Sequence, residues 1–118
     1  LGLKRLLATT AGVSTNIFDE VDAGIGGTVA TVVGQELQLL GRSQQILCVT
    51  HLPQIACFAD THFRVSKEVQ GGRTLTRVQK LSEPERATEL ARMLGGTLLS
   101  PTTLAQAQEM LRAARPPA

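Results

Sequence analysis

The 118-residue sequence predicts an α/β domain in which a mostly parallel sheet is flanked by helices and completed by a terminal β-hairpin. One observation is the alternation of segments with helical apolar spacing and short segments rich in apolar and β-branched residues. The second is a pair of strand-like segments separated by a turn at Gly71 and Gly72. The length suits one domain, and 42% hydrophobic residues suffice for a globular core.

The N-terminal half supplies helix, strand, helix and strand in turn. We predict a helix over Leu1–Thr10, because Leu3, Leu6, Leu7 and Thr10 share one helical face, with Gly12 ending it. A strand over 13–18 follows from its β-branched residues. A helix over 28–40 follows from an apolar stripe and is ended by Gly41. The apolar run 45–50 is typical of a buried parallel strand.

The C-terminal half supplies a hairpin and three helices. Pro53 opens a short helix over 53–59, since proline suits the first helical position. Strands over 62–69 and 73–81 flank the glycine turn. Pro84 begins a helix that ends at Gly95 and Gly96. Ser100 as N-cap and Pro101 as first residue begin the last helix, whose apolar stripe contains Leu104, Ala107, Met110 and Leu111.

Composition excludes several classes of protein. Three Phe without Tyr or Trp argue against a base-stacking surface for single-stranded nucleic acid. No apolar run reaches the ~18 residues of a membrane span, and no secretory signal opens the chain. The missing initiator Met predicts a fragment.

Cys48 and Cys57 lie in apolar surroundings and are expected to be buried thiols in a reducing compartment, with a disulfide as the alternative. No Cys/His cluster suggests zinc.

Three carboxylates follow the first predicted strand closely. Asp19, Glu20 and Asp22 would repel one another unless a cation compensates, and Mg²⁺ binds through one or two carboxylates together with substrate phosphates. Apolar residues followed by Asp-Glu are typical of a Walker B motif, in which Asp holds Mg²⁺ and Glu orients or deprotonates the attacking water. The alternative is a solvated acidic turn.

His51 directly follows the second predicted strand. In a parallel sheet it would lie at the same edge as Asp19 and Glu20, where it could contact a phosphate. The alternative is an ordinary surface or core histidine, which is the interpretation we give to His62. The loop with Gly24, Gly26 and Gly27 lacks the spacing and lysine of a phosphate-binding loop, so it is interpreted as a close-contact loop.

Basic residues gather in the predicted hairpin. Such a strip could meet nucleic-acid phosphates, and charges that protect an edge hairpin from aggregation are an equal alternative. Its members are Arg64, Lys67, Arg73, Arg77 and Lys80.

Two long segments resemble the C-terminal part of the RecN family, bacterial DNA double-strand-break repair ATPases related to the SMC proteins. They are IFDEVDAGIGG over 17–27 and LCVTHLPQIA over 47–56, and ELARMLGG over 89–96 is similar as well. One departure from the family is the polar Ser14, Thr15 and Asn16 in the Walker B strand. The resemblance implies a P-loop NTPase fold, with residues 1–118 as the C-terminal lobe of an ABC-type ATPase head. The Walker A loop, Q-loop, signature motif and coiled coil would lie upstream of Leu1.

The resemblance also implies roles for the site residues. Asp19 would help hold Mg²⁺, Glu20 would activate water, and His51 would contact the γ-phosphate of ATP. Asp22, Ala23 and Gly24 would belong to a D-loop that meets a second head in an ATP-dependent dimer. The implied partners are the missing N-terminal half of the head, that second head and DNA, with no membrane, in a cytoplasmic, nucleoid-associated protein.

Two other functions compete with this interpretation. One is a non-catalytic module that binds DNA or protein through the basic hairpin and the D-loop region. The other is an ABC transporter nucleotide-binding lobe, against which the glycines after Asp22 and the sequence Leu-Pro-Gln after His51 argue.

Overall fold

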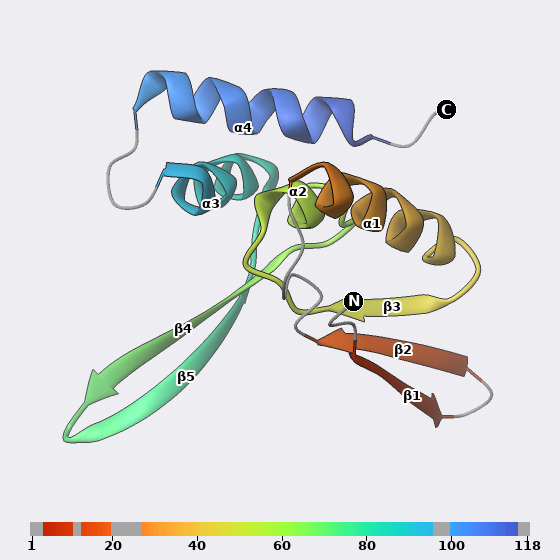
Figure 1. The fold of residues 1–118 in the computed structure, drawn as a ribbon. Coiled ribbons are helices and arrows are strands. Elements are labelled where there is room, and N and C mark those ends of the chain that lie inside the picture. Colours follow the sequence, from red (N-terminus) through yellow and green to blue (C-terminus); the bar gives the residue numbers. More distant parts are fainter. Residues whose placement is uncertain (1–3, 11–12, 20–26, 96–99, 116–118) are drawn as a thin grey trace.

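The computed structural model describes residues 4–10, 13–19, 27–95 and 100–115. These residues form a mixed α/β structure (Figure 1). Its elements, in chain order, are β1 (Lys4–Thr10), β2 (Val13–Asp19), α1 (Gly27–Leu40), β3 (Gln45–Cys48), α2 (Pro53–Ala56), β4 (Phe63–Gln70), β5 (Arg73–Lys80), α3 (Glu83–Gly95) and α4 (Pro101–Ala113).

The first three strands form one sheet in the order β1-β2-β3, and β4 pairs with β5 in a second sheet. β2 and β3 run parallel, with Phe18 opposite Cys48, as expected for two strands joined by a helix. β1 runs antiparallel to β2. The α/β class is therefore confirmed, whereas the larger sheet is mixed and the hairpin is followed by α3 and α4.

The helix predicted over residues 1–10 is wrong, because residues 4–10 form β1. This strand pairs with β2 along its whole length, from Lys4 opposite Asp19 to Thr10 opposite Val13. An isolated helix of about ten residues is only marginally stable in water, whereas the strand gains a complete partner. The β-branched Thr9 and Thr10 also favour extended backbone.

The helix α1 covers one face of the three-stranded sheet (Figure 1). Ala30 of α1 and Ile55 of α2 are buried there, and Phe18 of β2 packs against them. Because strand side chains alternate between faces, Ile17 and its partner Leu47 lie on the opposite face. No described helix covers that face, and the Leu47 side chain is 46% exposed.

The polar residues of β2 bond to the residues that lead into β3. The Asn16 side chain is buried, and its amide nitrogen donates to the side-chain oxygen of Gln44. The Thr15 hydroxyl donates to the side-chain oxygen of Gln45 over 2.9 Å. These contacts give hydrogen-bond partners to the side chains of Thr15 and Asn16.

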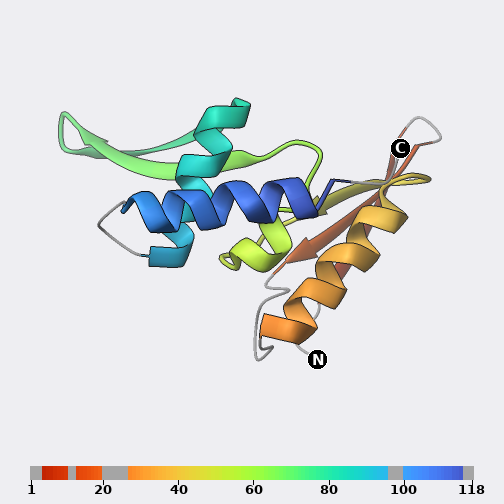
Figure 2. The same ribbon diagram turned by 90° about the horizontal axis from the view of Figure 1, so that it is seen from above.

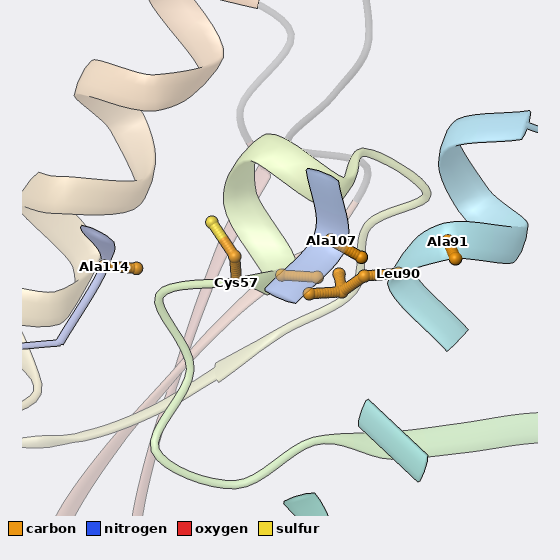
Figure 3. Close-up of a cluster of buried hydrophobic side chains, with 6 residues drawn as sticks. Cys57, Leu90, Ala91, Ala107 and Ala114 are labelled. Atoms are coloured by element: carbon orange, nitrogen blue, oxygen red, sulfur yellow. The ribbon is translucent and has the colours of Figure 1, made fainter. Parts of the chain in front are cut away.

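A second core lies where α2, α3 and α4 meet. Leu90 is fully buried there with Cys57, Ala91, Ala107 and Ala114 (Figure 3). Figure 2 shows α4 crossing above α2 and α3, with the hairpin and α1 on opposite sides of it. The Gln38 side chain of α1 donates to the Ala114 carbonyl over 2.7 Å, which links α1 to the end of α4.

Gly34 of α1 permits the close approach of α2. A Cβ at this position would lie 2.5 Å from Cδ2 of Phe58 and 3.1 Å from the carbonyl oxygen of Gln54. We expect Gly34→Ala to lower the free energy of unfolding by about 1–3 kcal/mol, because overpacking outweighs the better helix propensity of alanine. Thermal unfolding followed by circular dichroism measures this, since the chain has no Trp or Tyr for fluorescence.

The matched control for this change is Gly41→Ala. A Cβ there comes no closer than 3.4 Å to any other atom. We expect this variant to unfold at or above the melting temperature of the unchanged chain. Equal stabilisation by both substitutions would contradict the close packing of α1 on Phe58.

The hairpin β4–β5 projects away from the helices (Figure 1). Phe63 pairs with Lys80 and Gln70 with Arg73, which confirms the predicted antiparallel pair. Gly71 and Gly72 have φ angles of 57° and 79°, values that side chains disfavour, so the turn requires both glycines.

Helix starts follow local signals. The Ser100 hydroxyl accepts from the Thr103 backbone N–H over 3.1 Å, which confirms the predicted cap of α4. At α3 the helix begins one residue before Pro84. Ser82 and Glu85 cap it reciprocally, with the Ser82 N–H donating to the Glu85 carboxylate over 2.9 Å. These hydrogen bonds from Ser82 lower the pKa of Glu85.

The two cysteines differ in burial. Neither forms a disulfide, and Cys57 is buried as predicted, whereas Cys48 is exposed. The prediction for Cys48 is wrong because β3 is an edge strand among the described elements. Burial raises the pKa of the Cys57 thiol from 9.0 to about 11, so this thiol stays protonated at neutral pH.

Candidate functional site

The carboxyl ends of β2 and β3 meet at one edge of the sheet. Asp19 is the last residue of β2, and His51 lies three positions beyond Cys48, the last residue of β3. The two strand ends are held together, because the Val49 N–H donates to the Phe18 carbonyl over 2.8 Å. In open α/β sheets ligands bind outside the carboxyl ends of the strands, so this edge is the candidate site.

The structure describes two of the predicted site residues. Asp19 is half-buried at the strand end, and His51 is exposed in the loop before α2. Glu20, Asp22, Ala23 and Gly24 lie outside the described residues, so the predicted roles of these four rest on the sequence alone.

The donor set at this edge suits a hard divalent cation. The half-buried carboxylate of Asp19 is an oxygen ligand that remains open to solvent. Mg²⁺ usually takes one or two carboxylates and completes its shell with water and substrate phosphates. Asp19 would therefore supply one oxygen ligand to such a cation, and the other ligands would come from elsewhere. Among the described residues no group of three or more His, Cys, Asp or Glu could hold a metal by itself.

The loop that carries His51 leads into a buried helix. The Thr50 hydroxyl accepts from the Leu52 N–H over 3.0 Å, and α2 begins at Pro53. Ile55 and Ala56 of α2 are buried between α1 and α3. The segment after His51 is therefore anchored in both cores of the domain.

The basic residues of the hairpin do not form one strip. Cross-strand partners share a face, so Lys67 and Lys80 lie on the face of Phe63, whereas Arg64 and Arg77 lie on the other. Arg73 shares the face of Arg64. Arg77 is 3.6 Å from the Glu68 carboxylate, which offsets part of its charge. The described hairpin therefore divides its charge between two surfaces.

One face of the hairpin carries exposed apolar residues beside Lys67 and Lys80. Val65, Val69 and Val78 are exposed there, with 76% of Val69 accessible. A sheet face of this kind is typical of a surface that packs against another part of a protein. Sequence analysis assigned this hairpin by its charges and missed the apolar face, although the alternation of Phe63, Val65 and Val69 is visible in the sequence.

A buried polar cluster joins α3 to the base of the hairpin, and sequence analysis missed it apart from His62. Glu89 is only 3% exposed, and it pairs with Arg92 and lies 3.8 Å from Arg64. Burial and the nearby Arg86 lower the pKa of His62, and Glu89 opposes them. Within the described part of the chain, His62 Nδ1, Arg86 Nε and Glu89 Oε2 are buried without a hydrogen-bond partner.

A comparison with known proteins identifies the family. No family model matches the chain. The chain is 40% identical to the DNA repair protein RecN of Bacillus subtilis (strain 168) and 46% identical to that of Vibrio cholerae, in each case over 97% of its length. It is 47% identical to the RecN of Treponema pallidum over 96% of its length. The chain is thus a RecN-family sequence that matches the C-terminal part of these proteins, which confirms the resemblance.

The chain spans about a fifth of the length of the curated relatives it matches, from 20% to 21%. Among the described residues no helix is both long enough and apolar enough to cross a membrane.

Proposed function

We propose that this chain is the C-terminal lobe of a RecN-like ATPase head that acts in DNA double-strand-break repair. The observation that carries the proposal is the parallel pairing of β2 with β3, which brings Asp19 and the His51 loop to one sheet edge. The similarity to proteins named DNA repair protein RecN supports the repair role.

Each residue has a distinct task in this proposal. Asp19 would hold Mg²⁺, and the ion would supply positive charge beside the phosphates of ATP. Glu20 accepts a proton from the attacking water, and His51 donates a hydrogen bond to the γ-phosphate. Asp22, Ala23 and Gly24 meet a second head across the bound ATP. Positioning and electrostatic stabilisation supply most of the rate enhancement.

Exposed apolar residues at the edge of the sheet support a further part of the proposal, in which the rest of the head packs against this lobe. β3 is an edge strand of the described sheet, and Leu47 and Val49 are 46% and 57% exposed beside it. An apolar edge strand of this kind pairs readily with another strand. We propose that the N-terminal half of the head, which contains the Walker A loop, packs against this edge of the sheet.

The arrangement of the hairpin bears on where DNA would be contacted. The split of the hairpin charges between two faces and the exposed valines on one of them favour a protein partner for the hairpin over a phosphate backbone. DNA binding is therefore assigned to the complete protein, and the hairpin alone is not proposed as its site.

Replacement of His51 tests the proposal. In a full-length RecN protein that carries this sequence, we expect His51→Ala to lower kcat for ATP hydrolysis about 100-fold and to change the Kd for ATP much less. The matched control is Gln106→Ala, at an exposed position on α4, which should hydrolyse ATP at the unchanged rate. Unchanged hydrolysis by His51→Ala would refute the assignment of this residue.

A further inference from the structure

Arg86 of α3 binds the chain just after α2. Its guanidinium is buried, with Nη2 donating to the Ala59 carbonyl over 2.7 Å and Nη1 donating to the Asp60 carbonyl over 3.5 Å. Both acceptors are main-chain oxygens, so this contact fixes the backbone and is independent of the side chains at those positions. Nη1 also lies 3.5 Å from the Glu83 carboxylate, on the preceding turn of α3.

The backbone between His51 and Ala59 is hydrogen-bonded almost continuously. The Ala56 N–H donates to the Leu52 carbonyl over 3.1 Å, and the Ala59 N–H donates to the Ala56 carbonyl over 3.2 Å. At the other end, the Leu52 N–H donates to the Thr50 hydroxyl. A segment tied in this way moves as a unit, so a contact at Ala59 also constrains the loop that carries His51.

The burial of the Arg86 side chain is unfavourable in free energy, so its contacts need to be identified. Removing a guanidinium from water is unfavourable unless hydrogen bonds and charges compensate, and an apolar side chain of similar size would fill the same space at less cost. The Nε of Arg86 has no hydrogen-bond partner among the described residues. The compensating contacts of the guanidinium are the carbonyls of Ala59 and Asp60 and the carboxylate of Glu83.

We propose that Arg86 is a positioning residue for His51. By clamping the carbonyls of Ala59 and Asp60 to α3, it holds the segment 51–60 in the register that places His51 at the carboxyl edge of β2 and β3. This inference rests on the proposed ATPase function, since it concerns the same site. It predicts that loss of the clamp slows hydrolysis while ATP binding is retained.

The test compares three variants of a full-length RecN protein that carries this sequence. Arg86→Gln removes the clamp, and Arg86→Lys keeps the charge and a single donor group. Arg112→Gln is the matched control, because Arg112 is an exposed arginine of α4 that contacts the exposed Glu109 and not the α2 segment. Two experiments are carried out on each variant: steady-state kinetics give kcat and KM for ATP, and amide hydrogen exchange is followed over residues 52–60.

For Arg86→Gln we expect kcat to fall about tenfold or more with KM within about twofold, since small misplacements of a catalytic group cost rate. Exchange over 52–60 should rise about tenfold, while exchange in β5 stays unchanged. Arg86→Lys should recover part of both losses, and Arg112→Gln should match the unchanged protein.

Two outcomes would overturn the inference. One is unchanged kcat and unchanged exchange in Arg86→Gln. The other is faster exchange throughout the domain, with Arg86→Lys as impaired as Arg86→Gln, which would show a general loss of stability. A parent protein that does not hydrolyse ATP would refute the proposed function and with it the catalytic role of Arg86. The exchange measurement would then still decide whether Arg86 clamps the segment.

Discussion

Replacement of Glu20 by glutamine should lower ATP hydrolysis by a full-length RecN protein with this sequence about 100-fold or more. Glutamine has nearly the shape of glutamate, but its amide cannot accept a proton from water. Glu20 directly follows Asp19, the last residue of β2, in the sequence. Binding of ATP should survive, because the proposed Mg²⁺ ligand Asp19 is unchanged. Steady-state phosphate release and equilibrium binding of ATP measure the two effects separately.

The matched control for Glu20 is Glu36→Gln, the same substitution at an exposed position of α1. It should leave the rate of hydrolysis unchanged. Full activity after Glu20→Gln would refute the assignment of this carboxylate as the base. A parallel loss in both variants would show that the assay responds to charge in general and not to this site.

Replacement of Leu90 by alanine should cause the largest loss of stability. Leu90 is fully buried among α2, α3 and α4 (Figure 3). Loss of a buried leucine side chain costs about 2–5 kcal/mol, with the larger values where the surroundings cannot collapse into the cavity. Here the buried neighbours Ala56, Ala91 and Ala107 lie on three helices. Their side chains are too short to enter the cavity that the loss of Leu90 would leave.

Urea unfolding of the 118-residue chain, followed by circular dichroism at helical wavelengths, measures this loss. Leu39→Ala is the control, since Leu39 is 53% exposed on α1. Leu39→Ala should lower the free energy of unfolding much less than Leu90→Ala, because folding removes little apolar area from water at that position. Similar losses in both variants would contradict a core centred on Leu90.

Local chemistry accounts for the parts of the fold that were predicted correctly. Ser100 and Pro101 determine where α4 begins, and Gly71 and Gly72 determine the hairpin turn, because these residues act through their own backbone and nearest neighbours. Two of the six predicted site residues could be placed in the same way. Asp19 ends β2 and His51 follows β3, and a helix joins these strands in parallel, so both residues had to lie at one edge.

The errors concern residues whose environment is set by distant parts of the chain. The spacing of Leu6 and Leu7 fits a helix, and only the pairing with β2 makes residues 4–10 a strand. Cys48 lies in an apolar run, yet its strand is at the edge of the described sheet and leaves it exposed. A sequence pattern indicates which side chains of a segment can be buried. It does not show which other element packs against them.

The sequence by itself determined the RecN relationship, the β2–α1–β3 unit with Asp19 and His51 at its strand ends, and the hairpin. Short-range signals suffice for these features, because turns, caps and motifs act over a few residues. Only the tertiary structure decided that Arg86 is buried and bonded to the carbonyls after α2. Arg86 and Ala59 are 27 positions apart, and a charged residue in an amphipathic helix predicts a solvent-facing position until the packing of α3 on α2 is known.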